Sequence, residues 1–135
     1  MPAQQRVLLV ACAFILRASA QPPLAELKQT AEAMPESAPA QSNYGTGLKA
    51  AGRLEEAMQR FDEALRLDPT YARAYNNMGN AYQAMGDFEQ AVAAHGHAIL
   101  LMPGLATAYS NLGNALRELG KPGMAVEALE SAADC

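Results

Sequence analysis

The sequence has no tryptophan, only three phenylalanines and only two cysteines. Cys12 and Cys135 lie near opposite ends of the chain, a spacing that fits neither a disulfide framework nor a metal motif. β-branched residues are also sparse, whereas alanine and leucine, both strong helix formers, dominate the apolar set. The composition therefore favours an all-α fold in one domain of 135 residues.

Basic residues are also few. Ten lysines and arginines stand against 14 acidic residues, which gives a formal charge of −4. No cluster of basic residues offsets this balance locally, so the sequence argues against a protein that binds nucleic acid through the phosphate backbone.

Long apolar runs are missing as well. The N-terminal run from Val7 to Leu16 is too short for a confident transmembrane span. Arg6 precedes the run and small residues end it at Ala20, so residues 1–20 resemble a secretory signal peptide. A buried helix of a degenerate repeat and an uncleaved anchor are the alternatives. Cleavage predicts a secretory, extracellular or periplasmic protein, and otherwise we expect a cytoplasmic one.

A repeat occupies the rest of the chain. When the sequence is shifted against itself by 34 residues, six columns of identical residues coincide. These columns are Asn43/Asn77/Asn111, Gly45/Gly79/Gly113, Gly52/Gly86/Gly120, Ala57/Ala91/Ala125, Ala64/Ala98/Ala132 and Pro69/Pro103. A fixed period of this kind indicates a stack of similar units.

Each unit is expected to contain two helices. The first helices are predicted at 39–51, 72–85 and 106–119, and the second at 54–67, 88–101 and 122–133. The glycine column at 52 lies between the two helices, where a left-handed residue can end the first, and the prolines end the second. The glycine column at 45 lies inside a helix. There we expect the alanine column at 57 to allow a close approach of the two helices.

The segments Ala74–Tyr82 and Ala108–Leu116 resemble the first helix of the tetratricopeptide repeat family. The resemblance covers residues 38–135 as units 38–71, 72–105 and a truncated 106–135. It implies an all-α, right-handed superhelical stack of antiparallel helix pairs. The pattern is broken where Gln41 replaces an aromatic residue and His95 replaces a bulky apolar one. Before the repeats, residues 21–37 are predicted to form a capping helix, with Met34 on its apolar stripe, and a connector.

In this family the concave face is lined mainly by first helices, and here that face carries amides and hydroxyls. An amide both donates and accepts hydrogen bonds, so a column of asparagines can hold the backbone of an extended peptide. The column resembles the asparagine ladder of O-GlcNAc transferase-like arrays. Equally, these asparagines could simply brace neighbouring helices. The predicted peptide-binding residues are Asn43, Thr46, Arg73, Asn76, Asn77, Asn80, Gln83, Thr107, Ser110, Asn111, Asn114 and Arg117.

The sequence thus predicts a scaffold that binds a peptide or a partner protein, without a cofactor, a metal or a small-molecule substrate. A basic clamp for peptide carboxylates is disfavoured, because its positions carry Ser42, Thr46, Asn77, Thr107 and Asn111. No nucleophile and base have a catalytic spacing. Two further hypotheses stay open: a targeting fragment of a larger enzyme such as an O-glycosyltransferase, and self-association through the last helix.

The spacing of the two histidines argues against a shared metal site. His95 and His97 are two positions apart, so on a helix they point to different sides and cannot chelate one metal together.

Overall fold

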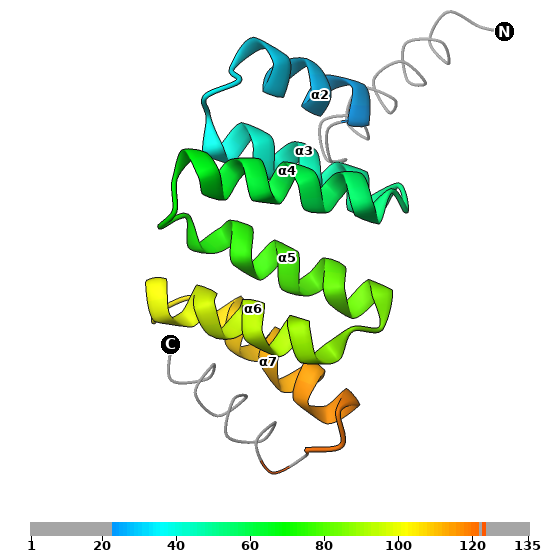
Figure 1. The fold of residues 1–135 in the computed structure, drawn as a ribbon, viewed down its shortest axis with the longest axis vertical. Helices are drawn as coiled ribbons and strands as arrows, with labels where there is room; N and C mark the ends of the chain where they lie inside the picture. Colours follow the sequence, from blue (N-terminus) through cyan, green and yellow to red (C-terminus); the bar gives the residue numbers. More distant parts are fainter. Residues whose placement is uncertain (1–22, 122, 124–135) are drawn as a thin grey trace, which may run out of the picture.

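The computed structural model describes residues 23–121 and 123, in which six helices pack as antiparallel neighbours in a single stack (Figure 1). The predicted signal peptide lies outside the described residues, as does nearly all of the predicted last helix, so both stay predictions. The helices are α2 (Leu24–Ala33), α3 (Ala38–Ala50), α4 (Leu54–Leu67), α5 (Ala72–Met85), α6 (Phe88–Leu101) and α7 (Ala106–Glu118).

The predicted helix bounds agree closely with the structure. Helices α4, α5 and α6 have the expected bounds, α3 begins and ends one residue earlier, and α7 ends one residue earlier. The glycines that end α3, α5 and α7 are left-handed, with φ near 80°. At the end of α3, the amide of Arg53 donates to the carbonyl of Leu48 across Gly52, at 2.9 Å. This bond satisfies a carbonyl that the helix end would otherwise leave without a partner.

The glycines inside the first helices make room for rings of the second helices. A Cβ atom added at Gly45 would lie 2.6 Å from the Phe61 ring, and one added at Gly79 would lie 2.5 Å from the His95 ring. The Ala57 carbonyl oxygen would be 3.1 Å from the added atom at Gly45. The close approach of the two helices was therefore predicted correctly, but the prediction did not include the Phe61 and His95 rings, which lie nearest to the two glycines.

The core between the helices consists mostly of alanine. Ala57, Ala64, Ala81, Ala91 and Ala98 are each 0% exposed. Leu48 and Phe61 are the only large apolar side chains of the described residues with less than 2% exposure. Since alanine adds little volume, the helix axes can lie close together, and the periodic placement of small residues sets the shape of the stack.

Helix α2 covers the N-terminal side of the stack. Ala31 is buried, and a Cβ atom added at Gly47 of α3 would lie 2.6 Å from Leu27. Met34, which was predicted to continue the apolar stripe of this helix, is instead 50% exposed. The helix ends at Ala33, so the helical spacing that the prediction assumed no longer applies to Met34. None of the described helices is long and apolar enough to cross a membrane.

Candidate functional site

A groove of about 460 Å³ runs across α3, α5 and α7, the first helices of the three units. Most of the residues predicted for the concave face take part in it. The lining residues are Asn43, Thr46, Tyr71, Arg73, Asn76, Asn77, Asn80, Leu105, Thr107 and Asn111. The groove is therefore built mainly from amide and hydroxyl side chains.

Tyr71 and Leu105 are lining residues that the sequence reasoning missed. They occupy the N-cap positions of α5 and α7, just before each helix begins. A signal was present, because the two positions are one 34-residue period apart. They add an aromatic ring and an aliphatic side chain to an otherwise polar wall.

Four predicted residues do not line the groove. Gln83 faces α6, where its Oε1 lies 3.1 Å from Nε2 of His95. Ser110, Asn114 and Arg117 lie on α7 but are not among the lining residues. The placement of Gln83 corrects the prediction: it is drawn toward α6 because a buried imidazole needs a polar partner.

The asparagine column also joins neighbouring repeats. Nδ2 of Asn77 donates to Oγ of Ser42 at 3.1 Å, and Nδ2 of Asn111 donates to Oδ1 of Asn76 at 3.2 Å. Ser42 and Asn76 are themselves one period apart, so the same contact occurs twice. In each case the amide nitrogen is used, while Oδ1 of Asn77 and of Asn111 makes no hydrogen bond within the described part of the chain. Bracing and ligand binding are therefore compatible functions of one side chain.

Asn43 and Asn80 differ from these braced residues. Asn43 is exposed and Asn80 is half-buried, and neither makes a side-chain hydrogen bond with another described residue. Each can offer two donors and one acceptor to a ligand. The Thr46 hydroxyl donates to the Ser42 carbonyl at 3.1 Å, so Oγ1 of Thr46 can still accept a hydrogen bond.

Asn76 mainly holds the wall of the groove in place. It is only 8% exposed, and its Nδ2 donates to Oγ1 of Thr107 at 3.4 Å. Its Oδ1 accepts from Asn111 and also lies 2.8 Å from Nδ1 of His95. Asn76 thus links α5 to both α6 and α7, and few of its hydrogen-bonding positions remain for a ligand.

His95 is the least expected part of this network. It is 0% exposed, and burial lowers the pKa of its imidazole from 6.5 to about 4. The neutral ring carries one N–H, whereas Oδ1 of Asn76 faces its Nδ1 and Oε1 of Gln83 faces its Nε2, so in a given tautomer only one of these two amide oxygens accepts from the ring. Its neighbour His97 instead stacks on Tyr75, with ring centroids 5.2 Å apart. Among the described residues, no group of three or more His, Cys, Asp or Glu side chains could hold a metal ion.

Arg73 is the one charged residue among those that line the groove. It forms no ion pair with any described carboxylate, whereas Arg53 and Arg66 are paired with Glu56 and Glu63. The groove is therefore nearly neutral, with a single positive charge near the start of α5.

Two family models match the chain. A model described as TPR repeat matches residues 47–86, and one described as tetratricopeptide repeat matches residues 70–135. The two matches overlap and together run from the end of α3 through the last predicted unit. They carry nothing specific to O-GlcNAc transferase-like proteins. No curated protein matches the sequence.

Several solved structures are similar to this chain. Two structures of MamA share 27% identity with it, have TM-scores of 0.73 and 0.72, and each cover 82% of this chain. The chain spans 65% and 61% of those MamA chains, somewhat less than two thirds of their length.

The first and second TPR of Spaghetti (RPAP3), each bound to the HSP90 peptide SRMEEVD, are also similar. They have identities of 23% and 26% and TM-scores of 0.70 and 0.69. The matches cover 73% and 72% of this chain and 79% and 90% of those chains. The 34-residue period, the stacked antiparallel helices and the family models agree, and the chain is a tetratricopeptide repeat protein.

Proposed function

We propose that the groove binds an extended peptide segment of a partner protein. The observation that carries this proposal is the repeated brace at Asn77 and Asn111, which leaves the amide oxygen of each side chain without a partner among the described residues. Two similar repeat domains, those of RPAP3, were solved with a peptide bound. The proposed role is to hold a partner and not to catalyse a reaction.

The chemistry suits a peptide backbone. An extended peptide presents N–H and C=O groups that no regular structure satisfies, and each must find a partner when the peptide is bound. The free oxygens of Asn77 and Asn111 can accept from backbone N–H groups, and Asn80 can both donate and accept. Recognition of the backbone tolerates many peptide side chains, so affinity would depend weakly on the peptide sequence at these points.

The brace also lowers the cost of binding. A free asparagine loses rotamer freedom when a ligand orders it, at a cost of about 0.5–1.5 kcal/mol per side chain. Asn77 and Asn111 are already held by Ser42 and Asn76 before any peptide arrives. The wall is therefore preorganised, which supports binding by side chains that could not bind tightly alone.

The residues at the ends of the wall suggest a preference. Tyr71 and Leu105 can contact an apolar side chain, and Arg73 can pair with an acidic one. A two-carboxylate clamp is not part of the proposal. Ser42, one of the clamp positions, is 1% exposed and already accepts from Asn77, so it cannot hold a carboxylate.

The proposal can be tested with a peptide selected against the full chain by phage display. We expect Asn77→Ala and Asn80→Ala each to weaken binding of that peptide about tenfold, as measured by fluorescence anisotropy. Asn80 makes no side-chain bond within the described structure, so its truncation should leave the far-UV circular dichroism unchanged.

Gln90→Ala provides the matched control, because Gln90 is an exposed amide on α6 and lies outside the groove. The Gln90→Ala variant should bind the selected peptide with the same affinity as the unmodified chain. If Asn77→Ala and Asn80→Ala bind the peptide as tightly as Gln90→Ala does, the groove is not the binding site.

A further inference from the structure

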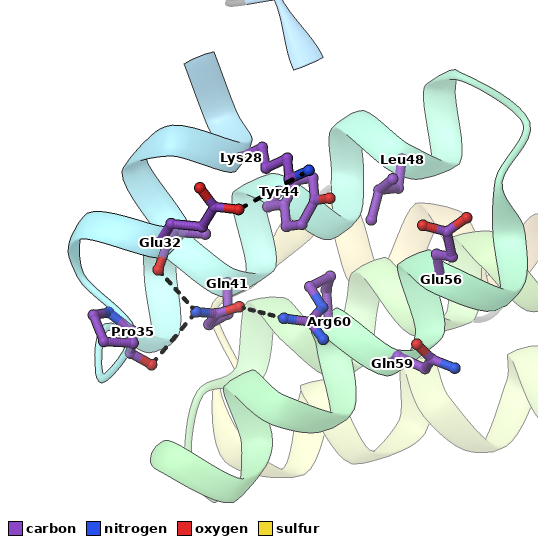
Figure 2. Close-up of a pocket in the computed structure, with 10 residues that line it drawn as sticks. Lys28, Glu32, Pro35, Gln41, Tyr44, Leu48, Glu56, Gln59 and Arg60 are labelled. Carbon is purple, nitrogen blue, oxygen red and sulfur yellow. Dashed lines mark hydrogen bonds and ion pairs between the residues drawn. The ribbon is translucent and has the colours of Figure 1, made fainter. Parts of the chain in front are cut away.

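A second pocket lies on a different part of the molecule. It has a volume of about 360 Å³, and its lining residues come from α2, α3, α4 and the connector between α2 and α3 (Figure 2). None of them lines the groove. This volume is in the range of small-ligand sites. Its lining residues are Lys28, Ala31, Glu32, Pro35, Gln41, Tyr44, Leu48, Glu56, Gln59 and Arg60.

Gln41 forms the base of this pocket and is 4% exposed. Its Nε2 donates to the carbonyl oxygens of Ala31 and Pro35, at 3.3 and 3.4 Å. Its Oε1 accepts from Nη1 of Arg60 at 3.2 Å, and Figure 2 shows this bond across the pocket. Both ends of the amide are therefore occupied, and Gln41 serves to hold the guanidinium of Arg60 in position.

Arg60 is fixed from a second side by Tyr44. The guanidinium carbon lies 6.0 Å from the centroid of the Tyr44 ring, within the range of a cation–π contact. A guanidinium carries five N–H donors in a planar fork, and Gln41 takes one of them. Donors that match the two oxygens of a carboxylate remain.

The carboxylates near Arg60 form their ion pairs with other basic residues. Glu56 is bound through both carboxylate oxygens to Arg53, at 2.9 and 2.6 Å, and Glu32 lies 4.0 Å from Lys28. Glu63 is close enough for Arg60 to help lower its pKa, but the hydrogen bond from Arg66 is the larger cause. Arg60 itself forms no ion pair with a described carboxylate. Among the residues that the structure describes, Arg60 is thus a lining cation without a carboxylate partner, and Gln41 holds it in position.

The remaining lining residues are mixed in character: Gln59 is an exposed amide, whereas Leu48 and Ala31 are buried, with 1% and 4% exposure. The Tyr44 ring and Pro35 are the apolar groups of the lining that a ligand can reach. We propose that this pocket binds a monocarboxylate with an apolar body, in which Arg60 holds the carboxylate and the Tyr44 ring contacts the body. Such a carboxylate can be a small molecule or the C-terminus of a peptide. This site is separate from the peptide groove and does not depend on it.

Isothermal titration of the full chain tests the proposal with two matched pairs of probes. The first pair is 3-phenylpropanoate and its uncharged amide, and the second is N-acetyl-Ala-Ala-Phe with a free or an amidated C-terminus. We expect at least one free acid to bind about tenfold more tightly than its amide. The pair that shows the difference identifies the source of the carboxylate.

Arg60→Gln should remove the preference for the acid, and Arg60→Lys, which keeps the charge without the fork, should weaken it. Arg66→Gln is the control, because Arg66 is an exposed arginine of the same helix that does not line the pocket. Circular dichroism verifies that each variant folds. Absence of binding up to about 10 mM, equal binding of acid and amide, or an equal loss in Arg66→Gln would each overturn the proposal.

Discussion

The first two units bury different rings at the same position of the repeat. Phe61 of α4 covers Gly45, and His95 of α6 covers Gly79, and both rings are 0% exposed. The space they enter is nearly the same, since a Cβ atom at either glycine would come within 2.6 Å of the ring. The two units thus share a shape but differ in chemistry.

The difference extends to the first helices. His95 contacts Asn76 and Gln83, whereas the positions one period earlier carry Ser42 and Lys49. A phenyl ring needs no polar partner, and an imidazole without one would be costly to bury. The comparison teaches that this core position accepts a polar ring when the facing helix supplies amides. It also shows that the ring of the second unit is connected, through Asn76, to the groove wall.

Exchanging the two rings should change the free energy of unfolding more than any other variant proposed below. Phe61→His would place an imidazole beside Ser42 and Lys49, without the two amides, and would also lose apolar burial. We expect a loss of about 3–5 kcal/mol in the free energy of unfolding, measured by urea denaturation. His95→Phe should cost less than about 1.5 kcal/mol, because Asn76 keeps its bonds to Thr107 and Asn111. Equal losses of unfolding free energy in the two variants would show that Asn76 and Gln83 do not determine which ring this position accepts.

The second prediction concerns pH. The pKa of His95 is about 4 in the folded chain and 6.5 as a model value, so the unfolded chain binds a proton first as the pH falls. The stability that neutral His95 provides is complete above pH 6.5 and is lost progressively toward pH 4. The loss should be about 3 kcal/mol relative to His95→Phe, whose other titrating groups are the same. Parallel stability–pH curves for the two proteins would contradict the buried, neutral state of His95.

Substitution of Gly79, which packs against the His95 ring, should have the smallest effect on stability. Gly79→Ala would place a methyl group 2.5 Å from His95, and we expect a net loss of about 2 kcal/mol despite the better helix propensity of alanine. Gly96 of α6 is the control, because no atom lies within 4 Å of the added Cβ. Gly96→Ala should therefore raise the stability by about 0.5–1 kcal/mol. Thermal unfolding of both variants shows whether each substitution raises or lowers the stability. A change in the same direction in both would rule out the packing explanation.

Much of the fold could be predicted because its signals are local. The bounds of α4 and α6 follow from Pro69 and Pro103, which prevent each helix from continuing, and from the left-handed glycines before them. The groove was predictable in outline, since a 34-residue period places the asparagines on equivalent faces of successive helices. Tyr71 and Leu105 were missed, because no polar motif indicates them and the period places unlike residues at this position.

The partners of individual side chains were less predictable. Gln83 has the spacing of a groove residue but turns to α6, because His95 is buried there and requires a hydrogen-bond partner. Met34 has the spacing of an apolar stripe but lies beyond the end of α2. In both cases the outcome depends on what the neighbouring helix offers, which a sequence pattern does not contain.

The sequence by itself determined the repeat: its period, its helix ends and the glycines that allow close packing, because these depend on residues near one another in the chain. Only the tertiary structure decided which polar groups are used up inside the protein and which remain for a ligand. Within the described structure, the amide oxygens of Asn77 and Asn111 have no partner, because residues 35 positions earlier accept from the amide nitrogens and leave the oxygens unused. Arg60 has no carboxylate partner within the described residues, and Glu56, four residues before it, is bound to Arg53 instead. Such competition among donors and acceptors is resolved only when the helices are packed together.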